Sequence, residues 1–196
     1  MPQLRQPLPA APWTVLLELS DNESEAHARE RFESLLGQAL EGGTIGDAAI
    51  AESVAQSHTM WHLRESIPLA QAEEGLNIKH DIALPVSRIP AFCEMTQAAL
   101  ERAVAGVRLV NFGHLGDGNL HYNVQAPVGV DAAVFLAERE HEINHIVYDA
   151  VAAHGGSISA EHGVGVLKRE ELVQYKDATA LALMRAVKQA LDPRGL

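Results

Sequence analysis

The chain has 196 residues, enough for one domain with a sizeable hydrophobic core, and its 47% apolar and 21% charged residues are typical of a globular protein. A formal net charge of -11 argues against nucleic acid or an anionic membrane as the main partner, because both favour a basic surface. No apolar run approaches the roughly 20 residues that span a bilayer, and we expect no export signal. The single cysteine, Cys93, excludes an internal disulfide, suits a reducing cytoplasm and is expected on the buried side of a helix.

The first part of the chain predicts strands and helices in alternation. Residues 1–12, with four prolines, form an expected extended lead-in or an artificial boundary of the chain. The elements expected after it are, in order, a strand over 13–19, a helix that ends near Glu41, a strand over 44–50 and a helix over 52–74. Polar residues at 20–23 offer caps for the first helix, and Pro68 should kink or break the second.

The rest of the chain predicts a sheet with covering helices. The expected elements are a strand over 78–85, a helix over 87–105 capped by Ser87, strands over 107–113 and 119–125, a helix over 131–153, an extended segment over 157–162 and a helix over 168–191. The apolar stripe of the helix over 87–105 consists of Phe92, Met95, Ala99 and Leu100. Strands interleaved with helices, plus a local hairpin, predict an α+β fold in which a mostly antiparallel sheet has helices packed on one face.

The segment 111–123 carries the strongest local signal of the sequence. Asp117 and Gly118 predict a type I′ turn, because this turn needs positive φ at both central positions and Asp-Gly tolerates that well. Such a turn places His114 directly opposite His121. Directly opposed residues keep their Cβ atoms about 4.5–5.5 Å apart, so both rings can bind one metal ion.

The predicted hairpin has one chemical face and one packing face. Alternation along the strands puts Phe112 and Asn123 on the face of the two histidines, while Leu115 and Leu120 point into a core. The competing interpretation of the histidines is a stacked or hydrogen-bonded structural pair.

A second candidate segment follows the Gly-Gly turn at 155–156. Glu161 and His162 lie between glycines, which allow the backbone to approach a ligand closely. A carboxylate beside an imidazole can supply one metal ligand and one base. With His114 and His121, Glu161 completes a His, His, Glu set that suits a catalytic metal site with an open position for substrate.

Arg64 and Lys79 are the cationic candidates. A guanidinium and an ammonium from separate elements can hold a carboxylate, although an ordinary surface charge is the competing explanation for either residue alone. Period-two alternation puts Lys79 and Asp81 on one face of the strand over 78–85, and His80 on the other.

Residues 141–145 read His-Glu-x-x-His, the pattern of zinc proteases, on a predicted helix. The i, i+4 spacing puts His141 and His145 on one helix face, but a protease needs a third ligand, for which Glu170 is only loosely suitable. The favoured interpretation of this pattern is a solvated helix face.

Five segments together resemble the C-terminal domain of FAD-linked oxidases. The group is that of D-lactate dehydrogenase, the glycolate oxidase FAD-linked subunit and D-2-hydroxyglutarate dehydrogenase, in the vanillyl-alcohol-oxidase superfamily. The likeness covers nearly the whole chain after residue 12, in order and spacing. The segments are Trp61–Glu65, Lys79–Pro85 with the Val-Ser after it, Gly113–Asn123, Gly155–Gly165 and Leu191–Leu196.

This resemblance implies a role for each candidate. It implies a substrate or cap domain over the flavin ring, with a divalent metal, zinc or manganese, held by His114, His121 and Glu161. It further implies that His162 is the base and that Asn123 contacts substrate.

The resemblance also implies that Arg64 and Lys79 hold the substrate carboxylate. Four residues beyond the arginine, some members of the family carry a substrate-contacting hydroxyl, and Pro68 stands there in this chain. The implied reaction is oxidation of a D-2-hydroxy acid of the lactate, glycolate or 2-hydroxyglutarate type to the 2-oxo acid, with FAD as hydride acceptor.

The expected organisation is a C-terminal substrate domain over 13–196, with the FAD-binding domain N-terminal to it and absent from this chain. No Gly-rich pyrophosphate loop is seen in the sequence. We therefore expect the chain to fold but to hold FAD weakly and to lack turnover. Its expected partners are a small 2-hydroxy acid, its own FAD domain, an electron acceptor and a second copy in a homodimer, and its expected location is the cytoplasm.

Three other functions compete with this interpretation. One is a metal-binding or ligand-binding module without catalysis, and another is the zinc peptidase built on His141 and His145. The third is a flavin enzyme with non-redox chemistry, of the alkylglycerone-phosphate synthase type.

Overall fold

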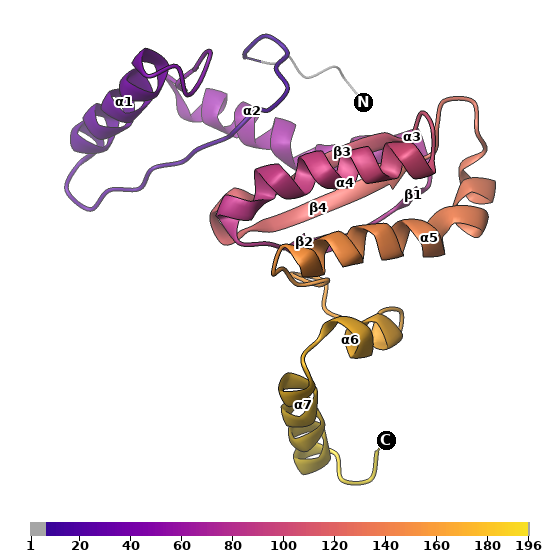
Figure 1. Ribbon diagram of the computed structural model, residues 1–196. Helices are drawn as coiled ribbons and strands as arrows, with labels where there is room; N and C mark the ends of the chain where they lie inside the picture. The colour runs from indigo at the N-terminus through magenta and orange to yellow at the C-terminus, as the bar shows by residue number, and fades with distance from the viewer. Residues whose placement is uncertain (1–6, 196) are drawn as a thin grey trace. The chain divides into compact units, whose positions relative to one another are not determined.

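The computed structural model describes residues 7–195, and the chain divides into two compact units, Met1–Glu74 and Gly75–Leu196 (Figure 1). Part of the expected lead-in over 1–12 lies outside the described residues, and 7–12 contain neither helix nor strand. Across the described part of the chain, every helix is too short or too polar to cross a membrane.

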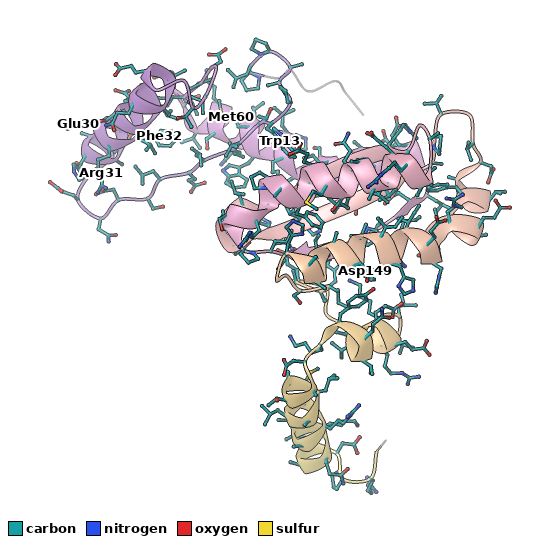
Figure 2. The ribbon with its side chains drawn as sticks, in the orientation of Figure 1. Trp13, Glu30, Arg31, Phe32, Met60 and Asp149 are labelled. Carbon is teal, nitrogen blue, oxygen red and sulfur yellow. The ribbon has the colours of Figure 1, made fainter. Side chains whose placement is uncertain are left out.

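The first unit contains three helices: α1 (Glu25–Glu41), α2 (Val54–Glu65) and α3 (Ile67–Glu74). No strand forms between residues 7 and 74, so the strands predicted over 13–19 and 44–50 are wrong. Their backbone groups have no neighbouring strand to pair with, and an unpaired strand is not stable in isolation. Trp13, labelled in Figure 2, is 66% exposed rather than part of a core.

The helices of this unit begin and end at residues with a clear physical role. The side chains of Ser24 and Ser53 cap α1 and α2 by accepting a backbone N–H of the first turn, and α1 ends at Glu41 as expected. The predicted break of the long helix is confirmed, because Ser66 separates α2 from α3. Pro68 lies in the first turn of α3, where its missing N–H costs no helical hydrogen bond.

The second unit is built on an antiparallel sheet whose central strand is β4 (Asn119–Gln125). β3 (Arg108–His114) pairs along one edge of β4. β1 (Asn77–Ile78) and β2 (Asp81–Ala83) pair along the other edge in the same register. They are two pieces of the strand predicted over 78–85.

One face of this sheet is covered by α4 (Ile89–Ala103) and α5 (Ala132–Ala153), as Figure 1 shows, so the predicted α+β fold is confirmed. The core between them is apolar and continuous. Its largest fully buried apolar members are Ile78, Ile82, Phe92, Leu100, Tyr122, Val124, Ile143, Val147 and Val151. The opposite sheet face carries polar side chains, and it contains the candidate site.

The helix predicted over 87–105 is present with a shifted apolar face. A 3-10 turn over Val86–Arg88 precedes α4, so Ser87 is not its cap. The buried residues of α4 are Ile89, Phe92, Cys93, Thr96 and Leu100. Met95 is 61% exposed, whereas the expected burial of Cys93 is confirmed.

The two C-terminal helices replace the single one predicted over 168–191. Asp177 separates these two helices. Its carboxylate caps the second helix by accepting the backbone N–H of Ala180. The elements are α6 (Arg169–Tyr175) and α7 (Ala178–Leu191). α5, in contrast, has the predicted bounds, with Asp131 as its N-cap and His154 as its C-cap.

Gly118 gives a direct test of the hairpin geometry. Its φ is +76°, and a Cβ there would overlap the backbone oxygen of Leu84. We expect Gly118→Ala to destabilise the chain by about 1–3 kcal/mol from backbone strain alone, with the overlap adding to it. Urea unfolding measures this, with Gly116→Ala as the matched control, because a Cβ at Gly116 meets open space. Equal midpoints for the two variants would contradict the geometry.

Candidate metal and substrate site

The hairpin that carries the candidate histidines differs from the predicted type I′ turn. A 3-10 turn over Leu115–Asp117 is followed by Gly118 in the left-handed region, and among residues 7–195 only glycines have positive φ. His114 therefore pairs with Asn119, and His121 pairs with Phe112. The prediction that the two histidines oppose each other is wrong, but they remain diagonal neighbours on one sheet face.

The faces of the hairpin follow the prediction except at the turn. Register places Phe112 and Asn123 on the histidine face, and Leu120 is buried in the core. Leu115 lies in the 3-10 turn and is 49% exposed, so its predicted burial is wrong.

Asp81, on β2, joins the sheet to the loop that carries the other candidates. Its Oδ2 atom accepts the backbone N–H groups of Ala160, Glu161 and His162 at 3.2, 2.8 and 2.8 Å. Its Oδ1 atom accepts the side-chain amide of Asn119 at 2.9 Å. A single buried carboxylate thus fixes three consecutive residues of the loop against the polar sheet face.

Opposing effects set the pKa of Asp81. Burial raises it, but the backbone N–H of His162, the Asn119 amide and the backbone N–H of Ala160 together hold the pKa below its ordinary value. The carboxylate is therefore ionised at neutral pH. The sequence pattern places Asp81 on the same strand face as Lys79 but indicates no role for it.

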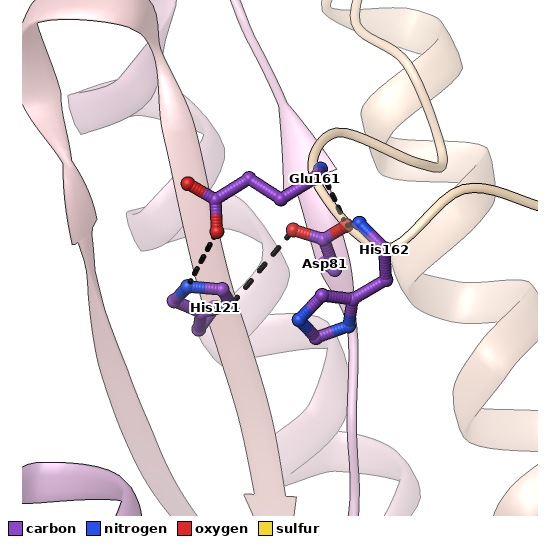
Figure 3. A group of neighbouring side chains, drawn as sticks. All are labelled: Asp81, His121, Glu161 and His162. Carbon is purple, nitrogen blue, oxygen red and sulfur yellow. Dashed lines mark hydrogen bonds and ion pairs between the residues drawn. The ribbon is translucent and has the colours of Figure 1, made fainter.

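The loop brings the Glu161 carboxylate to His121, as Figure 3 shows, and also near His114. Its oxygens lie 3.5 Å from Nε2 of His121 and 3.9 Å from Nε2 of His114. Nδ1 of His121 lies 3.8 Å from the Asp81 carboxylate. Ligand atoms about 2.0–2.2 Å from one zinc ion are roughly 3–3.6 Å apart, so small side-chain movements would let this set bind a divalent cation.

His162 lies beside the same cluster. Its ring stacks near that of His121, with centroids 5.6 Å apart and planes inclined by 28° (Figure 3). The potential ligand atoms of Asp81, His121, Glu161 and His162 all lie within 4.8 Å of one another. The structure therefore places His121 and Glu161 beside His162, while His114 stands outside this group of four and lies 3.9 Å from Glu161.

The remaining predicted substrate contacts are distributed over both units. The common register of β1 and β2 places Lys79 beside Asn123, on the same face as His121, with Lys79 exposed and Asn123 buried. Arg64 lies in the last turn of α2, in the first unit. Its role in holding a carboxylate stays a prediction.

The zinc-protease pattern on α5 does not form a protease site. Nε2 of His141 and Nε2 of His145 are 3.2 Å apart, but the Glu142 carboxylate pairs with Arg139 at 2.9 Å. Within residues 7–195 no third His, Cys, Asp or Glu ligand, Glu170 included, joins this pair.

Comparison with known proteins identifies the family of this chain. The family model described as FAD linked oxidases, C-terminal domain, matches residues 1–196, and the chain belongs to this family.

Its relatives include three named D-2-hydroxyglutarate dehydrogenases. That of Xanthomonas citri pv. viticola is 39% identical over 93% of this chain, and the mitochondrial protein of Arabidopsis thaliana is 36% identical over 93%. The mitochondrial protein of Danio rerio is 32% identical over 99%. The matched regions are 38%, 31% and 35% of these relatives, so the chain spans about a third of their length.

Asp81→Asn tests the carboxylate that fixes the loop. Both oxygens of the Asp81 carboxylate accept hydrogen bonds, so either orientation of the asparagine amide turns its NH₂ group towards another donor, the Asn119 amide or the loop N–H groups. Because hydrogen bonds are then lost in a buried position, we expect a loss of roughly 1–3 kcal/mol in the free energy of unfolding. Chemical unfolding at neutral pH measures it. Asp47→Asn, at an exposed aspartate, is the control and should change little.

The stability difference between wild type and Asp81→Asn should depend on pH in a defined direction. Because folding lowers the pKa of Asp81, its stabilisation is complete above the unfolded value of about 3.9 and is lost as the pH falls through the folded value. The gap between wild type and Asp81→Asn should therefore shrink in acid. A gap that widens below pH ~4 would contradict an ionised Asp81.

Proposed function

We propose that this chain is the substrate- and metal-binding domain of a FAD-dependent dehydrogenase that oxidises a D-2-hydroxy acid to the 2-oxo acid. The observation that carries the proposal is the Glu161 carboxylate, which lies 3.5 Å from His121 and 3.9 Å from His114, with the His162 ring beside His121. Family membership and the names of the relatives support it. Those names favour a 2-hydroxyglutarate-type dicarboxylate as the substrate.

Two imidazoles and one carboxylate suit zinc or manganese, and His114, His121 and Glu161 are the proposed ligands. A bound cation would attract the α-hydroxyl and carboxylate of the substrate and lower the pKa of that hydroxyl. Asp81 contributes by holding Glu161 and His162 through their backbone N–H groups.

His162 is the proposed base. Its ring lies beside His121, so a hydroxyl held at the cluster is within reach of its imidazole, which takes the proton as hydride leaves the substrate Cα. FAD supplies the two-electron acceptor for this hydride.

Cationic and amide side chains are proposed to orient the substrate. Lys79 and Asn123 share the sheet face of the cluster, so an ammonium and an amide can bind carboxylate oxygens there. Arg64 is proposed as a second carboxylate-binding group.

The rest of the whole protein is proposed to supply the FAD-binding domain, since this chain spans about a third of its relatives. We propose residues 13–196 as the substrate domain, a reducing compartment such as the cytoplasm as its location, and a homodimer as its assembly. The electron acceptor is proposed to be a partner of the whole protein.

Metal titration tests the proposed ligands. We expect His121→Ala and Glu161→Gln to weaken zinc binding more than about 100-fold, because losing a direct ligand should exceed the 10–100-fold effect of outer partners. Isothermal titration calorimetry of the chain measures this. His58→Ala is the control, since it removes an exposed histidine from helix α2. Unchanged zinc affinity in both His121→Ala and Glu161→Gln would contradict the proposed site.

Turnover tests the proposed base. In the whole protein, His162→Gln should lower kcat for D-2-hydroxyglutarate by about 100–10,000-fold in a dye-reduction assay while metal content stays unchanged. D-Lactate and glycolate are the comparison substrates. If the unaltered protein binds metal but reduces dye with none of the three acids, a non-catalytic metal-binding module becomes the better interpretation.

A further inference from the structure

A second group of metal-ligating side chains lies on α5, outside the candidate site. His141 and His145 are one helical turn apart, with Nε2 atoms 3.2 Å apart and ring centroids 4.4 Å apart. His141 is exposed and His145 is half-buried, so solvent reaches the pair.

A tyrosine and an aspartate determine which nitrogen of His145 carries a proton. The hydroxyl of Tyr175, on α6, donates to the carboxylate of Asp149 at 2.8 Å, and Nδ1 of His145 lies 3.3 Å from the same hydroxyl. Figure 2 labels Asp149 on α5. Because the hydroxyl has one proton and gives it to Asp149, it can only accept from His145. Nδ1 therefore holds the proton, and the neutral ring presents its Nε2 lone pair towards His141.

The ionisation of Tyr175 agrees with this arrangement. Its burial, together with the hydrogen bond to Asp149, raises the pKa of the phenol above its ordinary value. Tyr175 thus stays protonated at neutral pH and keeps Asp149 and His145 as its partners.

The spacing of the two nitrogens fits one shared ion. Two imidazole nitrogens about 2.0–2.1 Å from the same ion, at bond angles of about 90–110°, are roughly 2.9–3.4 Å apart. The 3.2 Å separation of the Nε2 atoms lies inside this range. A carboxylate that holds a ligating histidine in the right tautomer through its other nitrogen is a common outer partner in metal sites, and here Tyr175 transmits that effect.

We propose that His141 and His145 form an accessory site for a divalent transition-metal ion, with water as its other ligands and Tyr175 and Asp149 as positioning residues. Imidazole ligands favour Cu²⁺, Ni²⁺ and Zn²⁺ over Mg²⁺ and Ca²⁺, which prefer oxygen. The site is separate from that of His114, His121 and Glu161, and we assign it no hydrolytic role.

Nickel titration of the chain by calorimetry tests the site. The measurements are made on a His121→Ala background, so that the candidate site does not contribute its full ligand set. Adding His141→Ala should abolish one nickel-binding event or weaken it at least 10-fold. Adding His58→Ala, which removes an exposed helical histidine elsewhere, should leave that event unchanged. Equal nickel binding by these two variants would overturn the proposal.

Tyr175→Phe tests the positioning residues. The substitution keeps the ring but removes the hydroxyl that fixes His145, so nickel affinity should fall by about 10-fold or more, as is typical for loss of an outer partner. Circular dichroism checks that each variant retains its helices. Affinity unchanged in Tyr175→Phe would overturn the role of Tyr175 and Asp149, while a loss in His141→Gln as well as His141→Ala would support direct ligation.

Discussion

The candidate site depends on the hydrogen bonds that the Asp81 carboxylate accepts from the loop. The residues after the Gly-Gly turn form neither a regular strand nor a helix, so their own backbone cannot fix Glu161 or His162. Three backbone N–H groups converge on one buried oxygen and supply that order. Because charge-assisted hydrogen bonds are roughly twice as strong as neutral ones, an ionised aspartate suits this position better than an amide would.

The two faces of the sheet have different roles, because one packs into the core and the other carries the candidate site. Leu120, Tyr122 and Val124 of β4 pack into the apolar core with α4 and α5. The residues that alternate with them, among them His121 and Asn123, lie on the polar face. A one-residue slip of β4 would exchange the two sets, so core packing also fixes which side chains reach the site.

How much the sequence could predict depended on whether the signal was local. The capped helix from Asp131 to His154 and the strands around the hairpin followed from nearby residues, and both are present. The turn was missed because Asp117 does not adopt the positive φ that a type I′ turn requires. Asp81 had no predicted role because its partners lie about 80 positions along the chain, where periodicity carries no information.

Asp81 and Asp149 each position another group through a hydrogen bond that the carboxylate accepts, one in a buried and one in an exposed environment. Asp81 is buried and acts on the backbone of a loop, so its loss should be felt first in stability. Asp149 is exposed and acts on an imidazole through the Tyr175 hydroxyl, so the cost to folding should be small while the orientation of His145 changes. Measuring unfolding together with the nickel affinity of the His141–His145 pair therefore separates the two roles, because each carboxylate should dominate a different observable.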